Sequence, residues 1–154
     1  MVMQKFYADF LDKLGAIHYE ISEIILPMQV DALDWKPLAD IPSIGVFVVH
    51  IAGAEKYWIG DVISGDDTGR IRENEFKSEG KNNDELIGVL DESLDYVKRK
   101  FYGMQIDDLT RTVISPRDGS EITVAWALNH AMHHTALHLG HIQIIRQLWE
   151  SRDQ

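Results

Sequence analysis

The 154-residue sequence contains no cysteine, and this absence excludes several kinds of chemistry. Without cysteine there is no disulfide framework, no thiolate metal site and no thiol nucleophile. No window approaches the roughly 18 consecutive apolar residues that a membrane-spanning helix needs. The N-terminus carries acids and lacks the continuous apolar region of a signal peptide. We therefore expect a cytoplasmic protein that does not enter the membrane.

Positive charge is also scarce. Fifteen lysines and arginines stand against 25 acids, which gives a formal net charge of −10. Binding to nucleic acid or to an anionic membrane needs clustered cations, and the longest basic cluster is the short run at residues 98–100. We therefore expect a small-molecule partner and no nucleic acid. The sequence also lacks a Ser-His-Asp arrangement, a P-loop and a dinucleotide-binding glycine motif.

Apolar residues recur at helical spacing in four segments, which are residues 4–26, 43–64, 83–102 and from 123 almost to the C-terminus. Pro27 follows the first segment, Ser43 is a plausible cap for the second, and Gly103 closes the third. This pattern predicts one all-α domain over residues 1–154, folded as a four-helix bundle.

The three connections are about 12 to 20 residues long, more than an up-and-down bundle needs. At least one is therefore expected to cross between non-adjacent ends or to build the mouth of a site. Residues 31–43 are predicted as loop, because Pro37 and Pro42 disfavour helix in the residue before each. Apolar residues alternate around a PRDG turn in residues 109–123, which predicts a short β-hairpin before the last helix.

Five of the seven histidines lie in the last predicted helix: His130, His133, His134, His138 and His141. At about 100° per residue, four of them occupy the middle of the apolar stripe, whereas His133 lies on its flank and is expected to be partly solvated. Imidazoles side by side in an apolar core cannot all be charged, and each ring nitrogen needs a partner. A divalent cation meets this need by taking lone pairs from two or three rings.

His134 and His138 are spaced i,i+4, so their rings lie one turn apart on one face of the helix. A site needs a third ligand from another helix, and His50 faces inward on the second helix. Gly53 and Ala54, one turn further on, are expected to leave space there for a ligand or substrate. We therefore predict that His50, His134 and His138 bind a divalent metal.

The other histidines receive different interpretations. His130 and His141 remain open as outer ligands, as partners of the ligands or as catalytic bases. His18 is interpreted as structural. Three aromatic residues are candidates for lining a pocket beside the metal, with ordinary core packing as the alternative: Tyr57, Trp58 and Trp126.

The side of the second helix opposite His50 is apolar and carries Val48, Ala52 and Ile59. In a lone bundle this side would face solvent, so it predicts a homodimer interface. The alternative is that other segments of the same chain cover it.

Three segments together resemble the DinB/YfiT-like superfamily: WKP at residues 35–37, SIGVFVVHIAGAEKYWIGD at 43–61 and TVAWALNHAMHHTALHLGHIQ at 123–143. The resemblance covers essentially the whole chain and implies a four-helix bundle. Typical pieces of the family are a Trp-x-Pro loop, an inward histidine on the second helix and an H-x-x-x-H-x-G-Q motif on the fourth. The matching positions here are His50, His134, His138 and Gly140.

The resemblance implies that these three histidines bind nickel or zinc, with water in an open position. It also implies a homodimeric, thiol-dependent transferase or isomerase that uses bacillithiol, mycothiol, glutathione or a similar small thiol. The chain departs from the family pattern at Leu139, where arginine is common, and at His141, where glutamine is common. Neither departure removes a ligand, but the resemblance does not fix the substrate.

The leading hypothesis is a metal-dependent thiol S-transferase or isomerase, in which the metal lowers the pKa of a water or of a substrate thiol. Because the chain has no cysteine, that thiol is a cosubstrate. Metal-assisted hydrolysis is the second hypothesis. A non-catalytic bundle that binds a metal or a small molecule is the third.

Overall fold

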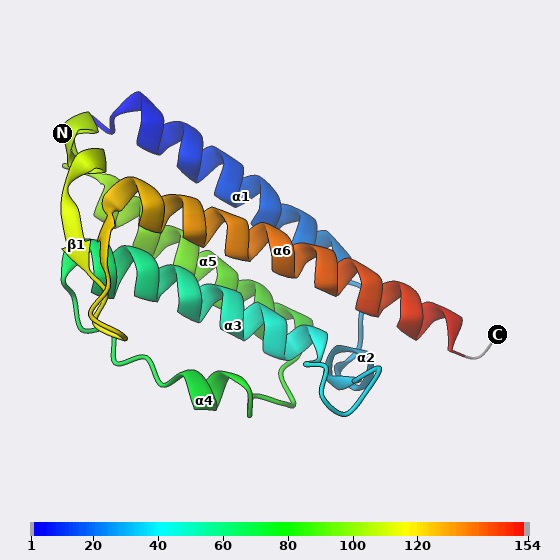
Figure 1. The fold of residues 1–154 in the computed structure, drawn as a ribbon. Helices are drawn as coiled ribbons and strands as arrows, with labels where there is room; N and C mark the ends of the chain where they lie inside the picture. The colour runs from blue at the N-terminus through cyan, green and yellow to red at the C-terminus, as the bar shows by residue number, and fades with distance from the viewer. Residues whose placement is uncertain (1, 153–154) are drawn as a thin grey trace.

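Four long helices packed side by side make up most of the protein (Figure 1), which we describe over residues 2–152 of a computed structural model. The third α-helix continues directly into a π-helical segment, η1. The long elements are α1 (Lys5–Ile25), α3 (Ile44–Lys56) with η1 (Tyr57–Ser64), α5 (Asn83–Phe101) and α6 (Val124–Ser151). The predicted all-α four-helix bundle is confirmed.

The short elements lie in the connections between the long helices. They are α2 (Val30–Asp34), α4 (Arg72–Glu75), the 3-10 helix η2 (Ile106–Thr110), β1 (Thr112–Ile114) and β2 (Glu121–Thr123). The two strands pair antiparallel, with Val113 opposite Ile122. Gly119 has a φ of 73° in the turn between them, a conformation that favours glycine. The predicted hairpin is therefore confirmed.

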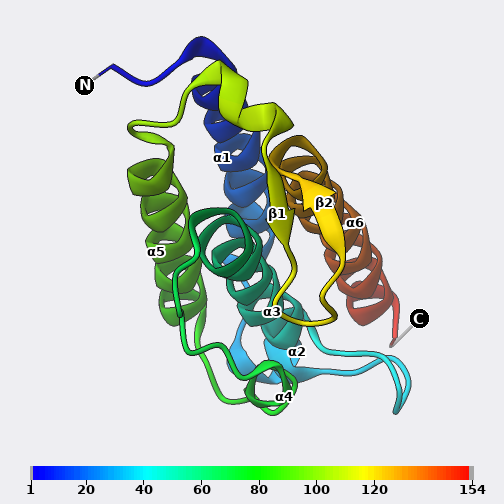
Figure 2. The same ribbon diagram turned by 60° about the vertical axis from the view of Figure 1, so that its left-hand side comes forward.

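The chain crosses the bundle twice. Both α1 and α3 pack mainly against α5 and α6, so α1 and α3 occupy diagonal corners (Figure 2). The connections from α1 to α3 and from α5 to α6 therefore join non-adjacent corners. This arrangement accounts for their length, as the sequence predicted for at least one of them.

Polar side chains fix the starts of three long helices. The hydroxyl of Ser43 accepts the backbone N–H of Val46 at 3.3 Å, as predicted for this cap. Asn82 and Glu85 form a reciprocal capping box at the start of α5. Thr123 caps α6 with its hydroxyl and so sets where the histidine-rich helix begins.

Three short helices and the π-helix depart from the predictions. Residues 31–43 were predicted as loop, but α2 lies partly inside this range, because Pro37 constrains only the residue before it and the helix ends earlier, at extended Trp35. The helices α4 and η2 are too short for apolar periodicity to show them. The predicted helix 43–64 is α-helical only to Lys56. A change from α- to π-helix leaves no mark in apolar spacing.

The buried apolar side chains form two clusters along the bundle, and a polar layer lies between them. On α3, α5 and α6 one buried polar residue stands between members of the two clusters, and on α1 His18 contacts one of these polar residues. These four residues form the Glu55 cluster: His18, Glu55, Ser93 and Thr135. Their exposed fractions are 4%, 0%, 0% and 0%. This burial agrees with a structural role for His18.

The carboxylate of Glu55 joins the four long helices. Its Oε1 lies 2.8 Å from Nε2 of His18 and accepts the Thr135 hydroxyl at 2.8 Å. Its Oε2 accepts the Ser93 hydroxyl at 2.7 Å. Three hydrogen bonds to one buried carboxylate satisfy its need for partners. They also hold α3 and α6, the two helices that carry the candidate ligands, in one register.

The apolar side of α3 and η1 that predicted a dimer interface is buried within the chain. Val48, Ala52 and Ile59 are 0%, 2% and 0% exposed, and Oγ of Ser93 on α5 lies 3.3 Å from the Ala52 carbonyl oxygen. The alternative, burial by the chain's own segments, is confirmed. The interface prediction for this face is wrong, and a homodimer then depends on the family resemblance alone.

Candidate metal centre

The three histidines predicted as ligands meet between α3 and α6. His134 Nε2 lies 3.0 Å from His50 Nε2 and 3.1 Å from His138 Nε2. One nitrogen from each ring lies within 4.8 Å of the others, and within residues 2–152 no other trio of His, Asp or Glu converges in this way. The i,i+4 spacing of His134 and His138 and the inward position of His50 on α3 thus selected three side chains that the fold brings together.

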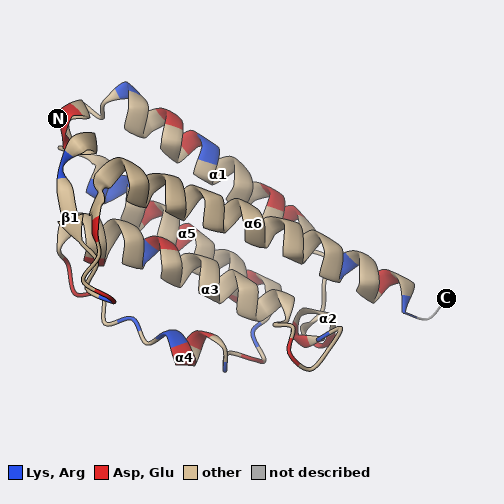
Figure 3. Ribbon diagram, viewed as in Figure 1, with Lys and Arg blue, Asp and Glu red and all other residues tan. Residues whose placement is uncertain are grey.

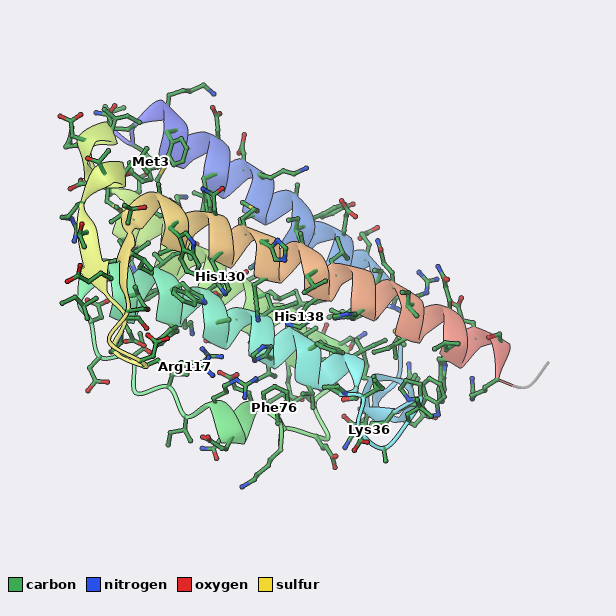
Figure 4. All side chains as sticks on the ribbon, in the orientation of Figure 1. Met3, Lys36, Phe76, Arg117, His130 and His138 are labelled. Atoms are coloured by element: carbon green, nitrogen blue, oxygen red, sulfur yellow. The ribbon has the colours of Figure 1, made fainter. Side chains whose placement is uncertain are left out.

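The helix that supplies two of these histidines has little charge. Residues 124–145 of α6 contain no Lys, Arg, Asp or Glu (Figure 3). This stretch packs against α1 and α3, so His134 and His138 are directed into the bundle towards His50. Figure 4 shows His138 on the side of α6 that faces α3.

The electrostatics of the trio suit a cation. Burial, together with the neighbouring histidines, lowers the pKa of His134 to about 3 and that of His138 to about 4. Both rings are therefore neutral at pH 7 and offer lone pairs. Nitrogens about 2.0 Å from a tetrahedral zinc ion would lie about 3.3 Å apart, close to the observed separations. The donor set therefore fits a divalent ion such as zinc or nickel.

His50 has a carboxylate behind it. Its Nδ1 lies 2.8 Å from Oε2 of Glu75, and Arg70 donates to both oxygens of the same carboxylate. Burial alone would raise the pKa of Glu75, but the hydrogen bonds from Arg70 and His50 outweigh it and hold the pKa below its ordinary value. The Phe76 ring lies 5.0 Å from the His50 ring, below α3 in Figure 4.

The space beside Gly53 is not free for a ligand, as the sequence had suggested. A Cβ atom on Gly53 would lie 2.1 Å from Oε1 of Glu75. The prediction is therefore wrong for Gly53, because a side chain from the connection after η1 fills the gap. Ala54 does line the cavity described below.

His138 has a different neighbour behind it. Its Nδ1 lies 3.1 Å from Nδ1 of His141, and the Phe47 ring packs against both imidazoles at 4.8 and 5.3 Å. His141 therefore contacts a candidate ligand and lies outside the converging trio. Its other side borders an apolar cavity of about 800 Å³ that Trp35 also lines.

A polar cavity of about 920 Å³ opens beside His50 and His134. Tyr57 and Trp58 line it, in agreement with the pocket alternative considered for them, whereas Trp126 does not line it and is 48% exposed. The other walls come from the connection after η1, from the hairpin and from α6, and include Arg70, Arg72, Arg117 and His130. In Figure 4, Arg117 lies on the hairpin side of the cavity, below His130.

His130 and His133 have different surroundings although they are close in sequence. His130 lies between two indoles, 4.5 Å from the Trp58 ring and 5.0 Å from the Trp126 ring. Burial, with a smaller contribution from His133, lowers the pKa of His130. It is therefore a neutral base at the cavity wall. His133 is exposed, as predicted.

Sequence reasoning missed Glu75 and Arg70. Both lie between η1 and α5, in a segment without apolar periodicity, so no pattern placed them near His50. The charge next to an aromatic in "ENEF" (residues 73–76) gives no specific signal either.

No helix in residues 2–152 combines the length and the apolar character that a membrane crossing requires.

Comparison with known families then decides the affiliation. The sequence model of the mycothiol S-transferase family matches residues 21–151, a range that contains all three candidate ligands. The chain belongs to the mycothiol S-transferase family. This membership, with structural neighbours named as DinB-like proteins, confirms the resemblance to the DinB/YfiT-like superfamily. No curated protein sequence gives a significant match.

Solved structures similar to this family member share its fold at low identity. A conserved protein from Enterococcus faecalis superposes with a TM-score of 0.79 at 16% identity, over 94% of this chain and 97% of that one. YfiT from Bacillus subtilis, described as a probable metal-dependent hydrolase with an unusual four-helix bundle topology, gives 0.74 at 13%, over 96% and 89%. A mycothiol-dependent maleylpyruvate isomerase gives 0.64 at 12%, over 86% of this chain and 59% of its own.

Proposed function

We propose that this protein is a divalent-metal-dependent enzyme that joins the sulfur of a low-molecular-weight thiol to an electrophilic small molecule. The observation that carries the proposal is the convergence of the His50, His134 and His138 Nε2 atoms beside a cavity of about 920 Å³. Membership of the mycothiol S-transferase family and likeness to a mycothiol-dependent isomerase support the thiol as cosubstrate.

The three imidazoles would hold nickel or zinc, both of which accept imidazole nitrogen. Three protein ligands leave at least one position open for catalysis, and the cavity lies beside His50 and His134. When bound, the ion supplies Lewis acidity that lowers the pKa of a thiol near it. The thiol enters from outside, because the chain has no cysteine.

The cavity walls give the chain's own residues distinct tasks. Tyr57 and Trp58 provide aromatic surface for the apolar part of a substrate, and Arg117 provides a cation for an anionic group. His130 is neutral and lines the cavity. We assign it the acceptance of the thiol proton as the carbon–sulfur bond forms and the bond from that carbon to its leaving group breaks, the leaving group departing with the electron pair of that bond. His141 contacts His138 from behind and has a positioning role.

Metal-dependent hydrolysis is the second candidate function. The likeness to YfiT, itself described as a probable metal-dependent hydrolase, favours it. The same site would then direct a water, in place of a thiol, at the substrate, with His130 again accepting the proton.

The test uses untagged protein loaded with zinc or nickel. Mass spectrometry follows product formation from mycothiol, bacillithiol or glutathione with a panel of electrophiles. We expect conjugates that EDTA abolishes. His130→Asn should keep the metal but lose about 10²- to 10⁴-fold in rate, whereas exposed His133→Asn should keep both. If loaded protein neither forms a conjugate nor hydrolyses any member of the panel, and EDTA only lowers the melting temperature, the protein is a non-catalytic binding bundle.

A further inference from the structure

We infer that Glu75 is a positioning residue that fixes His50 as a metal ligand, and that Gly53 is the glycine that lets the Glu75 carboxylate reach it. The inference rests on the proposed metal site and adds to it two residues outside the histidine motif. It concerns the one candidate ligand that α3 supplies.

The first step is the position of one proton. For the His50 Nε2 atom to present a lone pair towards His134 and His138, its ring proton must be on Nδ1. The Glu75 Oε2 atom lies 2.8 Å from this Nδ1 and accepts that proton in a hydrogen bond. The Glu75 side chain is only 9% exposed, so water competes little for the bond. A carboxylate behind a histidine fixes the ring orientation and makes it a more basic ligand.

Charge balance is the second step. A buried carboxylate is costly without a countercharge, and Arg70 supplies one through two hydrogen bonds, Nη2 to Oε2 being 2.9 Å long. The two bonds hold the carboxylate in one orientation. The same guanidinium lies 5.5 Å from the centre of the Tyr57 ring and lines the polar cavity. The pair therefore connects the cavity wall to His50.

Gly53 is the third step. It lies inside α3, where glycine is less favourable than alanine. An added Cβ would lie 2.1 Å from Oε1 of Glu75, 2.8 Å from its Cδ and 3.3 Å from Nε of Arg70. Because Arg70 pins the carboxylate, Glu75 cannot make room and keep its bond to His50. The need for this close approach accounts for a glycine at this position.

The other two candidate ligands lack such a partner. Nδ1 of His134 is buried and has no hydrogen-bond partner among residues 2–152, and Nδ1 of His138 faces His141. Of the three candidate ligands, His50 is therefore the one whose second ring nitrogen contacts a carboxylate. Loss of this support should weaken metal binding even though all three histidines remain in place.

The experiment measures zinc affinity by competition with a chromophoric chelator in untagged Glu75→Ala, Glu75→Gln and Gly53→Ala variants. We expect Glu75→Ala to bind zinc about 10- to 100-fold more weakly. Glu75→Gln keeps an acceptor oxygen and should lose less. Gly53→Ala retains both His50 and Glu75 and only separates them, so it should also lose about tenfold. Glu79→Ala is the control, because Glu79 is exposed in the same connection and pairs with Lys36.

A second readout separates positioning from mere folding. Nitrogen-15 NMR of the metal-free protein should show the His50 proton on Nδ1 in the wild type, and a shift from this tautomer in Glu75→Ala and Gly53→Ala. Folded Glu75→Ala and Gly53→Ala proteins that bind zinc within twofold of wild type would overturn the inference. If His138→Ala lost zinc in the same experiment, the proposed three-histidine site would still stand. If Glu75→Ala does not fold, Gly53→Ala decides. A wild type that takes up no zinc overturns both proposals.

Discussion

Replacement of Glu55 by alanine removes the carboxylate that joins all four long helices. The variant loses the hydrogen bonds from Ser93 and Thr135 and leaves His18, 4% exposed, without its partner. Leaving a buried donor without its acceptor costs about 1 to 3 kcal/mol, so removal of this acceptor, which three buried groups share, is expected to cost about 3 to 5 kcal/mol. For a chain of this length each kcal/mol lowers the melting temperature by about 2 to 4 °C. We therefore expect a drop of about 6 to 20 °C.

Circular dichroism at 222 nm, with EDTA present to remove any metal contribution, measures this drop directly. Glu20→Ala is the matched control, because Glu20 is an exposed acid on α1, and it should melt within about 2 °C of wild type. Glu55→Gln keeps an acceptor oxygen and should fall between the two. A melting temperature of Glu55→Ala within about 3 °C of wild type would refute the reasoning that this layer stabilises the fold.

Further predictions concern pH, a helix cap and a close contact. The pKa values of His134 and His138, about 3 and about 4, lie below the unfolded value of about 6.5. The unfolded chain therefore binds more protons in this range, and stability decreases as the pH is lowered. Urea unfolding of metal-free protein should show this loss from about pH 6.5 towards 4, with a slope of up to about 1.4 kcal/mol per pH unit for each histidine, and His138→Gln should flatten it. Ser43→Ala removes the α3 cap and should cost about 1 kcal/mol in calorimetry. Gly60→Ala places a Cβ 2.1 Å from the Tyr96 hydroxyl and should lower the urea midpoint, at a cost of about 1 to 3 kcal/mol; unchanged midpoints would count against the packing described there.

The histidine trio was predictable because its members obey helical geometry. His134 and His138 sit one turn apart on an apolar stripe, and the same periodicity directs His50 inward on its own helix. The predicted helix boundaries were also close to the observed ones, because Ser43 and Gly103 are local signals that need no knowledge of the rest of the fold.

Residues that depend on contacts between distant segments were not predictable. Glu75 reaches His50 from a connection without periodicity, and only the folded arrangement shows that Gly53 makes room for it. Glu55 lies away from the His50 stripe, a position typical of a solvated acid. Its burial depends on three hydrogen-bonding partners from three other helices, which no single segment reveals.

The number of metal ions bound per chain, in wild type and in His138→Ala, tests the central claim most directly. Untagged protein is exposed to zinc or nickel, desalted and analysed by inductively coupled plasma mass spectrometry. The account predicts about one ion per chain in wild type and in the exposed-residue control His133→Ala, and far less in His138→Ala. Wild-type stoichiometry in His138→Ala would contradict the three-histidine site.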